Sequence, residues 1–202
     1  MSWHDGQVQW VVVVPVKPLV VAKTRLAGRQ RHQLALGFAQ DTVAAALGCR
    51  TVAEVLVVTD DAVVGKALGK MGAYVVPDKP DGGLNAAVRH GATLAGANPV
   101  AALTADLPAL RTADLTAALA AAHGRRSFVP DTPGTGTVLL AAPAGVPLQP
   151  RFGPGSAAAH EASGAVRLTG EWPSLRRDVD TAADLAEAAA LGLGPHTTAL
   201  VR

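Results

Sequence analysis

The run Val11-Val12-Val13-Val14, which lies between Trp10 and Pro15, decides the fold class. Because four β-branched residues in a row are apolar on both faces, the run is typical of a central strand in a parallel sheet that is covered on both sides. Further strands are predicted at 55–58, 74–76, 100–103, near 128 and at 138–141. Helices are predicted at 29–47, 63–71, 84–94, 112–122 and, as the last element, at 181–190. The alternation predicts a three-layer, Rossmann-like α/β fold with a mostly parallel sheet.

Length and composition limit the class of protein. A chain of 202 residues with 49% hydrophobic residues suits a single domain over residues 1–202, with residues 1–8 expected to form a disordered N-terminal tail. The net charge of +2 argues against a nucleic-acid-binding protein. The single Cys49 cannot form an internal disulfide, which fits a reducing compartment.

Membrane attachment and secretion are not expected. The apolar stretch 10–16 is far shorter than the ~20 residues that span a bilayer. Residues 2–9 contain neither Lys nor Arg, so no basic segment of a signal peptide precedes it. We therefore expect a cytoplasmic protein with no membrane partner.

The loops that follow the predicted strands are the places to search for a ligand, because ligands of open α/β sheets lie beyond the carboxyl ends of the strands. After the first strand, Lys17, Lys23 and Arg25 lie within nine residues and could converge on a triphosphate. An ordinary solvated loop is the alternative. The loop matches neither a Walker A motif nor G-x-G-x-x-G, so P-loop and dinucleotide-binding readings lose their main support.

Two acidic loops are candidates for a magnesium site. Asp106 follows the strand at 100–103, and Asp178 lies in the segment before the last predicted helix. Mg²⁺ takes one or two protein carboxylates and fills its octahedron with water and phosphate oxygens, so Asp106 and Asp178 could share it. Asp180 has a competing reading, because it precedes Thr181 and Asp184 at a helix N-terminus, where a carboxylate is stabilising. We therefore prefer Asp106 and Asp178 as the metal pair.

Two glycine-rich segments lie further along the chain, Gly134 to Thr137 and Phe152 to Ser156. The second runs into a short predicted helix through His160, whose first amides and Ser156 could receive a phosphate or carboxylate. Tight turns are the alternative for both segments. We interpret Trp3, Trp172, His160 and Cys49 as packing or surface residues, and no arrangement of a nucleophilic hydrolase is visible.

Taken together, six motifs resemble the guanylyltransferase family of coenzyme F(420) biosynthesis, which includes the phosphoenolpyruvate and the 2-phospho-L-lactate enzymes. The motifs are Val14 to Leu19, Ala22 to Leu26, Thr104 to Leu110, Gly134 to Thr137, Arg151 to Ser156 and Asp178 to Thr181. They cover nearly the whole chain in the same order. The family is similar to the molybdenum-cofactor guanylyltransferases, which implies a nucleotidyltransferase-type (GT-A) sheet. The sequence departs from that wider group by having Lys17-Pro18-Leu19 where a Gly-Gly loop is usual, which argues against a sugar or cofactor nucleotidyltransferase.

The resemblance also implies roles for individual residues. It assigns catalysis to Asp106, Asp178 and Lys23, and Mg²⁺ to Asp106 and Asp178. It assigns nucleotide binding to Lys17, Lys23, Arg25, Gly83 and Asn85. It assigns binding of the acid substrate to Thr137, Gly153 and Ser156.

The implied reaction is transfer of GMP from GTP to a phosphorylated three-carbon acid, with release of diphosphate. The Ala-, Gly- and Val-rich composition is typical of high-GC actinobacterial genomes, and for that lineage the resemblance implies phosphoenolpyruvate. The same reaction on 2-phospho-L-lactate is one alternative, and a non-catalytic nucleotide-binding α/β module is another. Hand-over of the product to the next transferase of the pathway and a homo-oligomer are both compatible with this reading.

Overall fold

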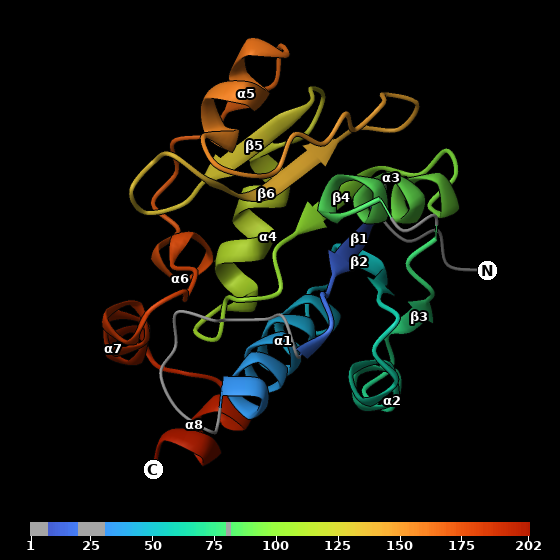
Figure 1. Ribbon diagram of the computed structural model, residues 1–202. Coiled ribbons are helices and arrows are strands. Elements are labelled where there is room, and N and C mark those ends of the chain that lie inside the picture. The colour runs from blue at the N-terminus through green and yellow to red at the C-terminus, as the bar shows by residue number, and fades with distance from the viewer. Residues whose placement is uncertain (1–7, 20–30, 80–81) are drawn as a thin grey trace, which may run out of the picture.

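A computed structural model describes residues 8–19, 31–79 and 82–202 and contains a seven-stranded sheet with strand order β3-β2-β1-β4-β6-β5-β7 (Figure 1). The strands are β1 (Trp10–Pro15), β2 (Val52–Val58), β3 (Tyr74–Val76), β4 (Val100–Leu103), β5 (Ser127–Pro130), β6 (Thr137–Ala142) and β7 (Val166–Arg167). Strand β1 pairs in parallel with both β2 and β4, as its apolar faces predict. Only β6 runs antiparallel to its neighbours β4 and β5 among these strands, so the expected mostly parallel sheet is confirmed.

Helices cover both faces of this sheet. They are α1 (Arg31–Leu47), α2 (Ala62–Gly69), α3 (Leu84–Leu94), α4 (Thr112–Ala121), α5 (Ser156–Ala162), α6 (Pro173–Arg176), α7 (Ala182–Leu191) and α8 (Pro195–Val201). Alternate residues of β1 enter two separate cores: Val12 and Val14 pack with residues of α1, α2 and α4, whereas Val11 and Val13 pack with residues of α3 and α5. The predicted three-layer arrangement follows from this alternation. Among the helices of the described ranges, none is both long and apolar enough to cross a lipid bilayer.

The beginning and the end of the chain differ from expectation. Val8, the last residue of the expected tail, packs against the core, while residues 1–7 lie outside the described ranges. The predicted helix at 181–190 is present as α7 but is not the last, because α8 follows and lies beside α1 (Figure 1). The carboxylate of buried Asp41 on α1 accepts hydrogen bonds from the backbone N–H groups of His196 and Thr197, at 3.0 and 2.8 Å. Pro195 at the first position of α8 is a local sequence signal for its start, whereas the cap from the distant Asp41 leaves none.

Helix α3 lies unusually close to the central strand at Gly91. A Cβ atom added at this position would overlap the buried Val13 side chain, so Gly91 permits the close approach of helix and strand. This contact brings the N-terminal end of α3 to the carboxyl edge of the sheet.

We expect Gly91→Ala to lower the free energy of unfolding by ~1–3 kcal/mol, because the added methyl group overpacks the core against Val13. Gly69→Ala is the matched control, since a Cβ there would lie 3.5 Å from Val75 Cγ2 in ordinary contact. Urea denaturation of the two variants measures the difference. Equal stability of both variants would contradict the close approach.

Candidate active site

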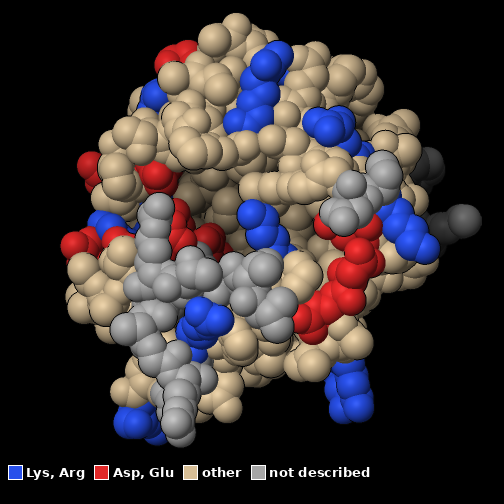
Figure 2. All heavy atoms as spheres, viewed as in Figure 1, with Lys and Arg blue, Asp and Glu red and all other residues tan. Residues whose placement is uncertain are grey.

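A cavity of about 380 Å³ opens at the carboxyl ends of β1 and β4, where the sequence predicts the ligand. One part of its lining is apolar and comes from Pro15, Val16, Leu19, Leu84, Leu103 and Phe152. The polar part comes from Lys17, Thr104, Asp106 and Asp180. Figure 2 shows this face as a hollow with a basic group near its centre and acidic side chains on two sides of that group.

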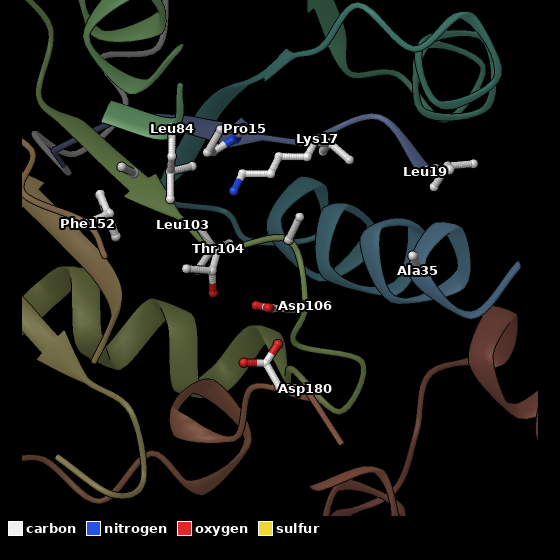
Figure 3. A pocket seen from close by; sticks show the side chains of 13 residues that line it. Pro15, Lys17, Leu19, Ala35, Leu84, Leu103, Thr104, Asp106, Phe152 and Asp180 are labelled. Atoms are coloured by element: carbon white, nitrogen blue, oxygen red, sulfur yellow. The ribbon is translucent and has the colours of Figure 1, made fainter. Parts of the chain in front are cut away.

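Lys17 projects into the cavity from the loop after β1 (Figure 3). Two backbone hydrogen bonds position this loop: Val16 N–H donates to the Val58 carbonyl at 3.0 Å, and Leu19 N–H donates to the Asp61 carboxylate at 3.0 Å. The bond from Leu19 is the main reason why the pKa of Asp61 is lowered, so the loop is held to an ionised carboxylate. Lys23 and Arg25, which the sequence places with Lys17, lie outside the described residues.

The structure brings Asp106 and Asp178 together. Val179 N–H donates to the Asp106 backbone carbonyl at 3.0 Å, which joins the loop after β4 to the segment before α7. Buried Thr42 on α1 supports the same loop, because its hydroxyl accepts a hydrogen bond from Leu107 N–H at 3.1 Å. Asp106 and Asp178, 72 positions apart in the sequence, therefore lie near each other, but of the two only Asp106 lines the cavity.

The electrostatics of Asp178 reflect its crowded position. Burial raises its pKa to about 7, and the neighbouring carboxylates of Asp106, Asp131 and Asp180 add to the effect. Like charges gathered at one place disfavour ionisation of each other, and a bound cation would relieve that repulsion.

Asp180 does not cap helix α7, which is the competing role that the sequence suggests for it. The N-cap of α7 is Thr181, which forms a capping box with Asp184, and the Asp184 carboxylate accepts hydrogen bonds from the N–H groups of both Asp180 and Thr181. Capping is thus performed by Thr181 and Asp184, while the Asp180 side chain points into the cavity opposite Lys17 (Figure 3). The alternating Asp178-Val179-Asp180 pattern is the signal for this, since buried Val179 separates two polar residues.

The donor set fits Mg²⁺. No group of three or more His, Cys, Asp and Glu side chains within residues 8–19, 31–79 and 82–202 forms a complete metal site by itself. A magnesium ion requires only one or two protein carboxylates when phosphate oxygens and water fill its other positions. The aspartates around Asp178 satisfy that requirement.

Thr104 is a cavity residue that was not among the predicted site residues. Its side chain points into the cavity (Figure 3), and its buried hydroxyl oxygen has no hydrogen-bond partner among the described residues. Its position directly after β4, two residues before Asp106, is the signal that could have identified it.

Gly83 and Asn85 lie at the start of α3, beside Leu84 of the cavity wall. Gly83 has φ of 78°, a conformation that favours glycine, and it precedes the first turn of the helix. The Asn85 side-chain amide donates to the Phe152 carbonyl at 2.9 Å and accepts from the Phe152 N–H at 2.7 Å. Asn85 therefore joins the loop before α5 to α3 by two hydrogen bonds, a role that the sequence does not reveal.

Thr137, Gly153 and Ser156 come together around the N-terminal end of α5. Thr104 N–H donates to the Val138 carbonyl, so Thr137 lies next to the strand that ends in the cavity. The first two amides of α5 are already bonded: Ser156 N–H donates to the Gly153 carbonyl and Ala157 N–H to the Thr135 carbonyl, both at 3.0 Å. The expectation that these amides receive a phosphate does not match this arrangement, because both already have partners.

His160 is fully buried on α5, so the packing interpretation is confirmed, but both of its ring nitrogens are hydrogen-bonded. Nδ1 lies 2.9 Å from the Thr137 hydroxyl, and Nε2 accepts a hydrogen bond from Arg151 N–H at 2.9 Å. Burial, followed by the charges of Arg126 and Arg151, lowers the pKa of His160 to about 4.

We expect His160 to make the protein less stable in acid. The unfolded histidine has a pKa near 6.5, so between pH 6.5 and about 4 the unfolded chain binds a proton that the folded chain does not. The free energy of unfolding therefore falls as the pH drops through this window, by roughly 1 kcal/mol per pH unit from this group. Denaturation of the wild type and of His160→Asn from pH 7 to pH 5 measures the effect. The stability difference between them should narrow, and a constant difference would contradict the lowered pKa.

Comparison with known proteins defines the class of this chain. Residues 35–175 match the family model of the MobA-like NTP transferase domain. A nucleotidyl transferase from Methanothermobacter thermautotroptrophicus superposes with a TM-score of 0.62 at 20% identity, covering 91% of this chain and 97% of that one. CMP:2-keto-3-deoxy-manno-octonic acid synthetase superposes with a TM-score of 0.56 at 18% identity, covering 91% of this chain and 98% of that one. The expected nucleotidyltransferase-type fold is confirmed, and the chain is a MobA-like NTP transferase.

Closer relatives define the branch. The phosphoenolpyruvate guanylyltransferase of Salinispora arenicola is 66% identical over 95% of this chain and 92% of its own length. The protein of the same name from Thermomonospora curvata is 57% identical over 98% of this chain and 90% of its own length. This chain belongs to the phosphoenolpyruvate guanylyltransferase family, so the resemblance seen in the sequence motifs is confirmed.

Proposed function

We propose that the protein transfers GMP from GTP to the phosphate of phosphoenolpyruvate, releasing diphosphate and giving enolpyruvoyl-diphospho-guanosine for coenzyme F(420) biosynthesis. One observation carries the proposal: Lys17 faces Asp106 and Asp180 across one cavity at the carboxyl edge of the sheet. The identity of 66% to a phosphoenolpyruvate guanylyltransferase over nearly the full length supports the choice of substrates.

The chemistry requires little from the protein beyond positioning and charge. The nucleophile is a phosphate oxygen of phosphoenolpyruvate, which is already anionic at neutral pH and needs no general base. It attacks the α-phosphorus of GTP, the bond from that phosphorus to the oxygen bridging to the β-phosphate breaks, and diphosphate leaves with the bonding electrons. Two polyanions must therefore be held together in line, and neutralising their charge is the main task.

Lys17 is the described cation suited to the triphosphate. Its side chain reaches into the cavity from a loop whose backbone is fixed by bonds to Val58 and Asp61, and its amine can donate to phosphate oxygens. Lys23 and Arg25 follow in the same loop and are assigned to the same phosphates from their sequence motif. Gly83 and Asn85 would border the guanine end, where Asn85 acts by holding Phe152 against the cavity.

Asp106 and Asp178 would hold Mg²⁺, and the position of Asp180 inside the cavity adds it as a third candidate. Bound between carboxylates and phosphate oxygens, the ion would supply positive charge to the reacting phosphates. The chain's own contribution is to keep the loop of Asp106 and the segment of Asp178 and Asp180 together through the bond from Val179 N–H to the Asp106 carbonyl.

The acid substrate is assigned to the neighbourhood of Thr137, Gly153 and Ser156. Gly153 has φ of 138° and follows Phe152 of the cavity wall, so backbone without a side chain lies where the cavity meets α5. The loop at 131–136 is closed by Asp131, whose carboxylate accepts from Thr135 N–H and Gly136 N–H at 2.9 Å each. These small residues leave room for the carboxylate and phosphate of a three-carbon acid.

The test is to incubate the protein with GTP, Mg²⁺ and either phosphoenolpyruvate or 2-phospho-L-lactate, together with the next transferase of the pathway to consume the labile product. Mass spectrometry of the products and diphosphate release with and without Mg²⁺ are the readouts. We expect product from phosphoenolpyruvate in the presence of Mg²⁺. Product from 2-phospho-L-lactate alone would overturn the choice of acid, and nucleotide binding without diphosphate release would favour the non-catalytic module.

A further inference from the structure

We propose that His160 is a positioning residue for the acid substrate: it fixes the Thr137 hydroxyl so that this group donates its hydrogen to the substrate anion. The inference rests on the proposed function, because it requires Thr137 to contact the acid. His160 is fully buried, and neither it nor the buried Thr137 is among the residues that line the cavity. Thr137 precedes Val138, whose carbonyl accepts a hydrogen bond from the N–H of the cavity residue Thr104.

The ring of His160 is held in one orientation. It lies in edge contact with Phe152, with ring centroids 5.2 Å apart and an interplanar angle of 76°, and in tilted contact with Phe128 at 5.8 Å. Its two nitrogens bond to different segments, Nδ1 to Thr137 at the start of β6 and Nε2 to Arg151 in the loop before Gly153. A rotation of the ring would break both bonds at once, so its orientation is determined by four separate neighbours.

The bond from Arg151 determines the tautomer. A backbone N–H can only donate, so Nε2 must be the unprotonated nitrogen that accepts it. In the neutral ring the hydrogen then lies on Nδ1, where the Thr137 oxygen 2.9 Å away is an acceptor beside the Ser156 backbone.

The direction of the Thr137 hydroxyl follows from this tautomer. A hydroxyl group has one hydrogen, and because the Thr137 oxygen accepts from His160, its own hydrogen points elsewhere. The Thr137 hydroxyl bonds to no other group among residues 8–19, 31–79 and 82–202. The opposite tautomer would turn the hydrogen of Thr137 toward Nδ1 and leave a lone pair facing an incoming anion.

The charge state of His160 supports this arrangement. Burial and the charges of Arg126 and Arg151 keep the ring neutral near pH 7. A protonated ring would place a hydrogen on Nε2 against the Arg151 N–H. The neutral ring is therefore the form that satisfies both neighbours.

Two amide variants separate the two bonds of His160. The Asn amide reaches the position of Nδ1 and can still donate to Thr137, whereas the Gln amide reaches the position of Nε2 and can accept from Arg151 but not donate to Thr137. We expect His160→Gln to weaken phosphoenolpyruvate binding about 10-fold and His160→Asn by no more than about 3-fold, as expected for loss of one hydrogen bond to a charged group. The KM for GTP should stay within about 2-fold in both variants.

Thr137→Val provides the double-mutant test. If His160 acts through the Thr137 hydroxyl, His160→Gln should cause no further loss of phosphoenolpyruvate affinity in the Thr137→Val background. Equal losses in the two amide variants, multiplying losses in the double variant, or a parallel rise of the KM for GTP would reduce His160 to a packing residue and overturn the inference.

Calorimetry with phosphoenolpyruvate in the absence of GTP separates failure of this inference from failure of the proposed function. Absence of product in the wild type together with intact phosphoenolpyruvate binding would reject the reaction. The role of His160 would then be decided by the phosphoenolpyruvate affinities of His160→Gln and His160→Asn. ¹⁵N NMR of the wild-type protein tests the tautomer without any variant. We expect a protonated Nδ1 and an unprotonated Nε2 at pH 7, and the reverse pattern would overturn the inference.

Discussion

Asp106→Asn should abolish nucleotidyl transfer, lowering kcat by at least ~10³-fold, while the protein keeps its fold. The substitution preserves the volume of the side chain but removes the charge that would hold a divalent cation against the phosphates of both substrates. The backbone bond from Val179 to the Asp106 carbonyl does not involve the side chain, so the joined loops should remain in place. Diphosphate release at saturating substrate and Mg²⁺ measures the loss, and circular dichroism checks the fold.

Two further variants make the result specific. Asp178→Asn should reduce turnover to a similar degree, whereas Glu54→Gln, an exposed acid near the amino end of β2 on the opposite edge, should not. Mg²⁺ should raise the melting temperature of the wild type and of Glu54→Gln but not that of Asp106→Asn. Turnover within a few-fold of the wild type for Asp106→Asn or Asp178→Asn would reject the metal pair.

The sheet was predictable because its strands carry unambiguous local signals. Val11 to Val14 is apolar on both faces, and such a run is buried on both faces only in the centre of a covered sheet. Once the order of strands and helices is recognised, the carboxyl edge and the loops around Lys17 and Asp106 follow from topology. The strand β7 and helices α6 and α8 are short and are missing from the sequence prediction. Pro173 and Pro195 mark the starts of the two helices, but partners such as Asp41 for α8 are distant in the sequence.

The site was predictable at the level of loops and less so at the level of atoms. Asp180 and Thr181 both suit a helix cap, and only the structure shows that Thr181 performs the capping while Asp180 faces the cavity. Asn85 bonds to the backbone of Phe152, which lies 67 positions away in the sequence. His160 bonds to the backbone of Arg151, which lies nine positions away across a loop. Such bonds depend on tertiary placement and leave no pattern in the spacing of residues.

The two candidate subsites share one structural element, the segment Arg151–Phe152. Asn85 at the start of α3 holds Phe152 from the side assigned to the nucleotide, and His160 holds Arg151 from the side assigned to the acid. Phe152 also lines the cavity between them. The two candidate subsites therefore share a short boundary whose two residues are each anchored by a separate side chain.

Lys17→Ala should weaken the use of GTP far more than the use of the acid, raising the KM for GTP by ~10–100-fold. The amine of Lys17 is the described cation inside the cavity, and removing it leaves the charge of the triphosphate less neutralised in both the ground state and the transition state. Lys23→Ala and Arg25→Ala should act in the same direction on the grounds of their motif. Steady-state kinetics with each substrate varied in turn measures the effect.

Lys70→Ala is the matched control, because Lys70 is an exposed lysine at the C-terminal end of α2 and does not line the cavity. Its KM for GTP should equal that of the wild type. A rise in the KM for phosphoenolpyruvate without a rise for GTP in Lys17→Ala would mean that the two subsites are exchanged. In that case the apolar wall formed by Leu84 and Phe152 would border the acid, and the loop around Gly153 would border the nucleotide.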